Sequence, residues 1–272
     1  MPYDPFIHAI LFSPGGGVNR LGKYDPATDT FYDLSANVVY GTAIQYYAYD
    51  SFNHVYYMGG NASSKFAKYD PATDTFTDLS SKVTWGSGFV GYTTYDSFDH
   101  LIFFGSGSVN NKFGRYDPAT DTFTDLSSKI TWGAATVADL AYDPFNHLIF
   151  FGSGVNNRFG KYDPTTNTFT DLSAEVSAYN ASIRELMYDS ADHLLFFGSG
   201  SANNKFGKYD PSLSKETDNP LFFDEKDYAG AQTVGAASFK SLYLKRPSTA
   251  HRNDRSPFVG ASDTALRLLA RK

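Results

Sequence analysis

The chain has 272 residues, of which 42% are hydrophobic and 17% aromatic, and it contains no cysteine. These proportions allow a large folded core, and the lack of cysteine excludes disulfides, thiolate metal sites and cysteine nucleophiles. The net charge of −6 is unevenly placed, because residues 240–272 carry +6 and residues 1–239 carry −12 (15 basic against 27 acidic residues). An acidic body argues against nucleic acid as the main partner of residues 1–239.

No targeting or membrane-spanning segment is predicted. Residues 1–17 lack the basic start of a secretory signal, and the apolar run Ile7–Phe12 is too short for its hydrophobic region. No stretch approaches the ~20 apolar residues of a membrane span. We therefore expect a cytoplasmic or particle-associated protein, with a cleaved precursor as the alternative.

One phrase recurs along the chain. It reads KYDPATDTFTDLS at Lys68–Ser80 and returns, with few changes, at 23–35, 115–127 and 161–173. A fifth copy begins at 208–211 and then loses the pattern. The tyrosines that mark the five copies are spaced by 45, 47, 46 and 47 residues. A period of about 40–50 residues built from strand-like segments is typical of propellers and other repeat arrays.

Each repeat predicts four short antiparallel strands. In the third repeat we expect strands at 89–95, 100–104, 112–116 and 122–126. A turn at 96–99, a Gly-rich loop at 105–111 and a Pro-containing turn connect them. Four antiparallel strands per repeat form the blade of a β-propeller, so the chain is predicted to be all-β with one blade per repeat.

The order of an apolar strand, a Gly-rich loop and a Tyr-Asp-Pro turn resembles the kelch repeat. His54–Phe76 matches best, with Gly59–Gly60 as the glycine pair. Other copies depart from the pattern, with Gly-Ser-Gly at 105–107 and Phe in place of the usual Trp. The resemblance covers about residues 3–211 and implies a propeller fold. It implies no particular chemistry, because propellers serve unrelated functions.

The ring is expected to close with five blades. The chain opens in mid-repeat at Tyr3, so the first blade is predicted to lack its innermost strand. Residues 231–239 align with the innermost strands of the other repeats, with Val234 at the position of Val137. This C-terminal strand would join the N-terminal blade and remove the exposed strand edges. The join is expected to be irregular, because Phe239 and Tyr3 align with the same position; a six-bladed ring is the alternative.

Two parts are therefore predicted, a five-bladed propeller over residues 1–239 and a basic C-terminal arm over residues 240–272. In the arm, residues 247–257 read as a polar linker, and the segment ALRLLARK predicts a short capped helix. A helix of about ten residues is marginal alone, so we expect it to dock on the propeller or on a partner. The candidate docking residues are Arg246, Arg252, Arg255, Leu266, Arg267 and Leu269.

Five histidines occupy one position of the repeat, each four residues after an aspartate: His8, His54, His100, His147 and His193. Histidine and carboxylate are good metal ligands. One histidine per blade, however, keeps the five apart. We therefore interpret each as a strand-start residue that hydrogen-bonds its turn through that aspartate. The aspartates at 70, 74 and 78 lack the spacing of a calcium loop. No metal or cofactor is predicted.

Two sets of loop residues are expected to share one rim of the propeller. The aromatic set is Tyr40, Trp85, Trp132 and Tyr179, and the amide set is Asn110, Asn111, Asn156, Asn157, Asn203 and Asn204. Aromatic faces beside amides suit the rings and hydroxyls of sugars, which gives a lectin hypothesis. The alternative is that the aromatic side chains wedge between blades and the asparagines form turns.

No catalytic residue is predicted, because near-identical repeats do not supply an asymmetric set of acids near the axis. The inner-strand departures from repetition are Asp139, Arg184 and Glu185. They leave a glycan-processing enzyme as a third class of function, against the reading of Arg184–Glu185 as a solvated pair. We expect a non-enzymatic binding or scaffolding propeller. Its role would be a structural or attachment subunit of a larger assembly, such as a virion or surface complex, with protein partners docked through residues 240–272.

Overall fold

The computed structural model describes residues 3–4, 8–13, 20–38, 44–60, 65–85, 88–107, 111–133, 135–155, 157–199, 205–213 and 222–223. The chain divides into two units, Met1–Ala236 and Ala237–Lys272. All described residues belong to the first unit. The predicted closing segment 231–239 and the predicted arm 240–272 lie outside the described residues.

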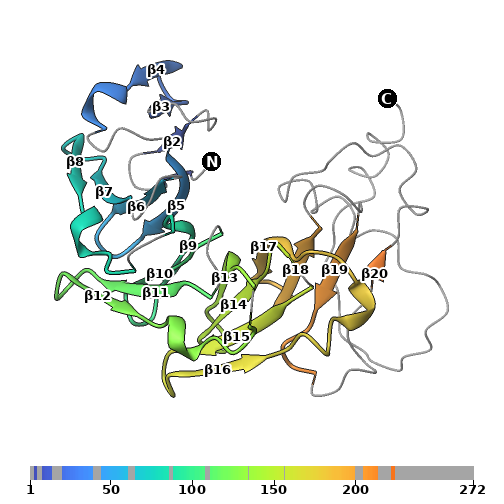
Figure 1. The fold of residues 1–272 in the computed structure, drawn as a ribbon. Helices are drawn as coiled ribbons and strands as arrows, with labels where there is room; N and C mark the ends of the chain where they lie inside the picture. The colour runs from blue at the N-terminus through green and yellow to red at the C-terminus, as the bar shows by residue number, and fades with distance from the viewer. Residues whose placement is uncertain are drawn as a thin grey trace, which may run out of the picture. The chain divides into compact units, whose positions relative to one another are not determined.

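Five antiparallel sheets of four strands follow one another along the chain (Figure 1). The first contains β1 (Tyr3–Asp4), β2 (Ala9–Phe12), β3 (Gly22–Asp25) and β4 (Thr30–Asp33). The second contains β5 (Ile44–Asp50), β6 (Val55–Gly60), β7 (Phe66–Asp70) and β8 (Thr75–Asp78). The third contains β9 (Gly91–Asp96), β10 (Leu101–Gly105), β11 (Phe113–Asp117) and β12 (Thr122–Asp125). The fourth contains β13 (Ala138–Asp143), β14 (Leu148–Gly152), β15 (Phe159–Asp163) and β16 (Thr168–Asp171). The fifth contains β17 (Arg184–Asp189), β18 (Leu194–Gly198), β19 (Phe206–Tyr209) and β20 (Phe222–Phe223).

Over the described residues, this architecture confirms the prediction of an all-β fold built from four-stranded antiparallel sheets. The predicted strands 100–104 and 122–126 correspond closely to β10 and β12. Short 3₁₀ turns, which the sequence analysis did not predict, follow the outer strands of the first three sheets and precede β17: η1 (Ser35–Asn37), η2 (Ser80–Lys82), η3 (Ser127–Lys129) and η4 (Ser177–Tyr179). In the third sheet, Asp125 accepts the backbone N–H of Ser127 at 2.8 Å, which starts the turn.

The hydrophobic core lies between successive sheets. One cluster of buried side chains fills each of the four boundaries from the first sheet to the fifth. The innermost strands β5, β9, β13 and β17 contact one another in turn, as expected of blades around a common axis. The backbones approach closely there. A Cβ atom on Gly59 would lie 2.0 Å from the carbonyl oxygen of Val90, and one on Gly105 would lie 2.7 Å from that of Val137. Only glycine fits at such a boundary.

The first sheet has an innermost strand, so the prediction that this strand would be missing is wrong. Tyr3 of β1 pairs with Ile10, in the same register as Tyr142 with Ile149 in the fourth sheet. β1 is short, however, and pairs only with the first two residues of β2. The fifth sheet also continues beyond the recognisable repeat, because β20 pairs with β19. Among the described residues, no strand pair joins the fifth sheet to the first.

Candidate binding surface

The turn between the first two strands has one structure in the second, third and fourth sheets. It starts with a buried aspartate whose Oδ1 accepts the backbone N–H two residues ahead at 2.9–3.0 Å, in the pairs Asp50–Phe52, Asp96–Phe98 and Asp143–Phe145. This Asx turn satisfies the backbone locally. Because the aspartate fills the inside of the turn, the phenylalanine projects outward. The three rings are 63%, 72% and 68% exposed, in chain order.

The histidine that ends each turn adopts a left-handed backbone conformation, with φ between 54° and 57° in all five copies. Histidine tolerates this conformation better than most side chains, which explains its recurrence at this position. The Nδ1 atoms of His100 and His193 lie 2.8 and 3.0 Å from the hydroxyl of the tyrosine five residues earlier. The expected contact with the aspartate four residues earlier is therefore wrong for these two histidines.

Each exposed phenylalanine rests on the histidine of the next sheet. The ring centroids lie 4.2 Å apart for Phe52 and His100, 4.5 Å for Phe98 and His147, and 4.3 Å for Phe145 and His193. We call these six side chains the Phe–His rim. It crosses three sheet boundaries, from the second sheet to the fifth.

Tyrosine hydroxyls lie beside the buried aspartates that start these turns. Burial, and then the carboxylate of Asp50, raises the pKa of Tyr95. Burial and Asp96 likewise raise the pKa of Tyr142. Since tyrosine ordinarily ionises near pH 10, both hydroxyls stay protonated at neutral pH and are available as donors.

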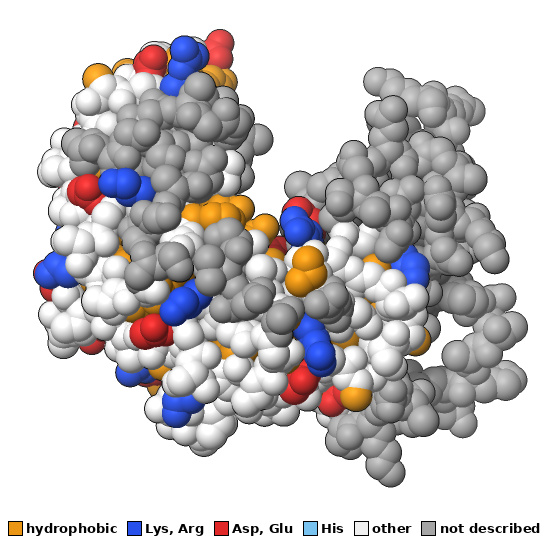
Figure 2. Space-filling model, in the orientation of Figure 1, with side chains coloured by type: hydrophobic (Ala, Val, Ile, Leu, Met, Phe, Trp, Pro, Cys, Tyr) orange, Lys and Arg blue, Asp and Glu red, His pale blue; other side chains and the backbone are white. Residues whose placement is uncertain are grey.

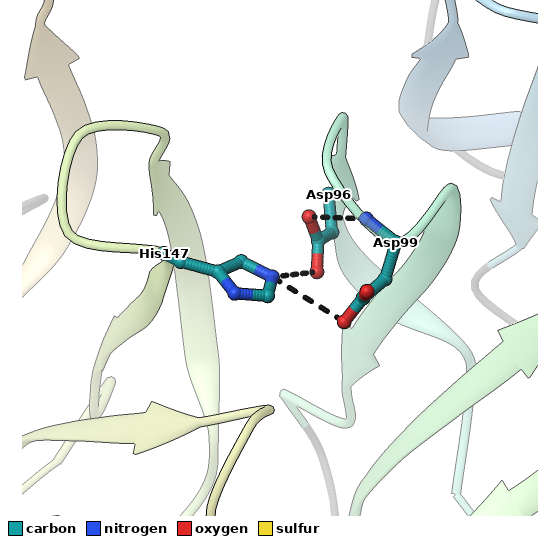
Figure 3. Close-up of side chains that lie close together, drawn as sticks. All are labelled: Asp96, Asp99 and His147. Carbon is teal, nitrogen blue, oxygen red and sulfur yellow. Dashed lines mark hydrogen bonds and ion pairs between the residues drawn. The ribbon is translucent and has the colours of Figure 1, made fainter.

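The boundary between the third and fourth sheets departs from this pattern. His147 Nε2 lies 3.0 Å from Asp96 Oδ2 and 3.4 Å from Asp99 Oδ2 (Figure 3). Figure 3 shows the imidazole reaching across from its own turn to the two carboxylates on the neighbouring turn. The other ring nitrogen of His147, Nδ1, lies 3.3 Å from the hydroxyl of Thr165.

A pocket of about 380 Å³ opens on the innermost strands of the third, fourth and fifth sheets, next to the rim. Its lining includes Tyr95, Tyr142, Tyr188, Leu140, Leu186 and Met187, and contains no charged side chain. Such a lining suits apolar contact better than acid–base chemistry.

The aromatic residues of the lectin hypothesis lie in the interior. Trp85, Trp132 and Tyr179 are 4%, 3% and 0% exposed and pack between sheets. Trp132, for example, contacts the rings of Phe151 and Phe169 edge-on. Of the two interpretations that the sequence left open, the structure matches the wedge between blades.

The amide residues of that hypothesis are described only in part. The side-chain amide of Asn157 donates to the carbonyl oxygen of Val176 at 3.0 Å. The backbone N–H of Asn111 donates to the carbonyl oxygen of Ala135 at 2.7 Å. Both contacts shape loops. Tyr40, Asn110, Asn156, Asn203 and Asn204 lie outside the described residues, as do the arm residues Arg246, Arg252, Arg255, Leu266, Arg267 and Leu269.

The inner-strand residues Asp139, Arg184 and Glu185 meet at the boundary between the fourth and fifth sheets. The Asp139 carboxylate accepts the backbone N–H of Leu186, and Arg184 donates to the carbonyl oxygen of Gly154 at 3.3 Å. Burial is the main cause that raises the pKa of Asp139 to about 7, although part of the side chain contacts solvent. These contacts join sheets, which gives the departures from repetition a structural role.

On the face drawn in Figure 2, basic and acidic side chains of the described residues are interspersed. That face therefore lacks the basic stripe typical of nucleic-acid binding. No helix in the described part of the chain has the length and apolar character needed to cross a membrane.

No protein-family model and no curated protein matches the chain. Solved structures share its fold. Virginiamycin B lyase from Staphylococcus aureus aligns with a TM-score of 0.62 and 12% identity, over 79% of this chain and 68% of that chain. A chain of the mitotic checkpoint complex aligns with a TM-score of 0.57 and 14% identity, over 71% of this chain and 57% of that chain. The β-propeller domain of Cps50 (Swd1) from Myceliophteria thermophila aligns with a TM-score of 0.56 and 9% identity, over 79% of this chain and 65% of that chain.

The chain spans less than two thirds of the length of the latter two proteins. At such low identities the likeness shows a propeller-like fold alone, because one fold serves many functions. The resemblance to kelch repeats in particular stays a prediction.

Proposed function

We propose that the protein is a non-enzymatic binding and scaffolding propeller, in which the basic arm of one subunit docks on the Phe–His rim of a neighbouring copy. The observation that carries the proposal is the exposure of Phe52, Phe98 and Phe145 at one position in three successive sheets. Isolated exposed phenylalanines are ordinary, but a regular row of them marks an interaction surface. On this proposal the protein is a structural or attachment subunit of a larger assembly, such as a virion or surface complex.

The chemistry of the rim supports the arm as its occupant. Exposed carboxylates flank the aromatic row, including Asp99, whose side chain is 40% exposed, and Asp192. The arm carries +6 and the rest of the chain −12. Leu266 and Leu269 would supply the buried contact against the phenylalanine rings, and the arginines would orient the encounter. Docking of this type weakens as salt rises, since exposed charges are screened within about 8–10 Å.

We further infer that the five sheets close into a ring. Residues 231–239 would run beside β2 where β1 stops, and Val234 would pack against the fifth sheet as Val137 packs against the third. The short β1 supports this closure, because no described strand pairs with the inner edge of β2 beyond Ile10. A closed ring would protect the edges of the first and fifth sheets.

The experiment is to measure the mass of the assembly by native mass spectrometry and light scattering at 50 and 500 mM salt. The full chain should form oligomers at low salt that dissociate at high salt. Deletion of residues 246–272 and the triple change Phe52→Ser, Phe98→Ser and Phe145→Ser should each give monomers at both salt concentrations.

The matched control is Phe31→Ser, because Phe31 is 55% exposed but lies on the outer strand β4, away from the rim. This variant should assemble like the full chain. Oligomers of unchanged mass in the deletion or the triple variant would contradict docking of the arm on the rim. A monomeric full chain at low salt would do the same.

A further inference from the structure

His147 differs in orientation from the histidines that end the equivalent turns of the second, third and fifth sheets. In the second, third and fifth sheets, the histidine Nδ1 lies 2.8–3.1 Å from the hydroxyl of its own tyrosine: Tyr49–His54, Tyr95–His100 and Tyr188–His193. In the fourth sheet, the ring of His147 stands at 90° to that of Tyr142. Its Nε2 atom points instead at Asp96 and Asp99 of the third sheet.

Two departures from the repeat meet at this imidazole. Asp99 stands where the neighbouring turns have Asn53 and Asn146, whose amides donate to the turn aspartate at 2.8 Å. A carboxylate cannot donate in this way, so the third sheet presents two acidic oxygens to His147. Thr165 stands where the second and third sheets have Ala72 and Ala119. Its hydroxyl holds Nδ1 and so directs Nε2 to the carboxylates.

One polar atom beside this cluster makes no hydrogen bond that meets the usual distance and angle limits. The hydroxyl of Tyr142 is buried beside Asp96, but it makes no hydrogen bond of acceptable geometry. Its counterparts in the second, third and fifth sheets are hydrogen-bonded to their histidines. Buried polar atoms without a partner are rare in folded proteins and call for a specific explanation.

We propose that Asp96, Asp99 and His147 bind one zinc ion across the boundary between the third and fourth sheets. Zinc binds imidazole nitrogen and carboxylate oxygen at about 2.0–2.2 Å, so two ligands of a tetrahedral ion lie roughly 3.3–3.6 Å apart. The measured separations of 3.0 and 3.4 Å are close to this range. The three ligand atoms all lie within 4.8 Å of one another. Water would occupy the fourth position.

The donor set selects the class of ion. Calcium and magnesium prefer six or more oxygen ligands, whereas one imidazole with two carboxylates suits zinc and similar first-row ions. Two carboxylates neutralise the charge of the ion. With zinc on Nε2, the Nδ1–H of His147 would donate to the hydroxyl of Thr165, which is the kind of outer-shell contact that commonly orients a zinc-bound histidine. The ion can enter from solvent, since the side chains of His147 and Asp99 are 17% and 40% exposed.

The test is titration of the full chain, without a histidine tag and after removal of metal, with zinc chloride in a calorimeter. We expect one site per chain. Asp99→Asn restores the residue found in the neighbouring turns and should therefore fold, but it should weaken zinc binding by at least about 10-fold. Thr165→Ala should weaken it by about 10-fold without changing the stoichiometry.

Cobalt serves as a second, spectroscopic probe of the same ligands. Cobalt bound to the full chain should give visible absorption bands that are lost in His147→Gln. The matched control is His100→Gln, which changes the equivalent histidine of the third sheet and should retain the bands. The proposal would be contradicted if the full chain and Asp99→Asn bound zinc with equal affinity. It would also be contradicted if the full chain showed no site of one-to-one stoichiometry. The three residues would then form only a hydrogen-bonded ion pair.

Discussion

The carboxylate of Asp139 on β13 accepts the backbone N–H of Leu186 on β17, and so joins the innermost strands of the fourth and fifth sheets. Asp139 occupies a bulged position of β13, where the pairing with β14 skips one residue and φ is 48°. Tyr92 and Glu185 adopt similar conformations on β9 and β17, with φ of 47° and 53°. At Asp139 the carboxylate reaches the neighbouring sheet, which places a titratable group at a sheet boundary.

Asp139 should make the stability of the protein depend on pH. Burial raises its pKa to about 7 in the folded chain, against about 3.9 in the unfolded chain. A raised pKa contributes stability that is complete below pH 4 and is lost as the pH rises through 7. The difference corresponds to at most about 4 kcal/mol, and to less where solvent reaches the side chain.

Asp139→Asn removes this titration while keeping an oxygen that can accept the N–H of Leu186. In urea denaturation, the variant should be more stable than the parent chain at pH 8. Its advantage should shrink steadily toward pH 4. A difference between the two proteins that is the same at pH 5 and pH 8 would show that Asp139 does not carry the pH dependence.

The buried tryptophans should contribute to stability rather than to ligand binding. Trp132→Ala removes a ring that is 3% exposed and packs between the third and fourth sheets, so it should cost about 3–5 kcal/mol. Phe98→Ala removes a ring that is 72% exposed and should change the free energy of unfolding by less than about 0.5 kcal/mol. Equal effects of the two changes would contradict the wedge interpretation of Trp132.

Ring closure predicts that the segment after Asp227 stabilises the whole propeller. Deletion of residues 228–272 would remove the closing strand, and a loss of about 3 kcal/mol would lower Tm by roughly 6–12 °C. The control is deletion of residues 246–272 alone, which keeps the closing strand. At 500 mM salt, where the full chain should also be a monomer, this deletion should leave Tm unchanged. If both shortened proteins have the same Tm as the full chain, residues 231–239 do not close the ring.

The sequence predicts the strands well because they depend on local patterns. The run HLIFF and the phrase TFTDL predict β10 and β12 to within about one residue at each end. The same patterns do not predict β20, the outer strand of the fifth sheet, because Phe222–Phe223 shares no motif with the outer strands of the other sheets. They also miss β1, because two residues leave no periodicity to recognise.

The candidate surface could not be predicted in the same way. The contact between Asp96 and His147 joins residues 51 apart in sequence, and its geometry depends on how two sheets pack. Phenylalanine is usually buried, so the composition offers no reason to place Phe98 on the surface. One signal was available in the sequence, namely that Asp99 replaces the asparagine of the neighbouring turns.

The central claim, a closed ring of five sheets, is tested most directly at Gly198. A Cβ atom on the equivalent Gly152 would lie 2.5 Å from the carbonyl oxygen of Ile183 in the next sheet, whereas at Gly198 it meets only the side chain of Glu185, at 3.8 Å, among the described residues. If Val234 packs there, Gly198→Ala should destabilise the protein as much as Gly152→Ala does, by about 1–3 kcal/mol in chemical denaturation. A Gly198→Ala protein as stable as the parent chain, beside a destabilised Gly152→Ala protein, would contradict closure.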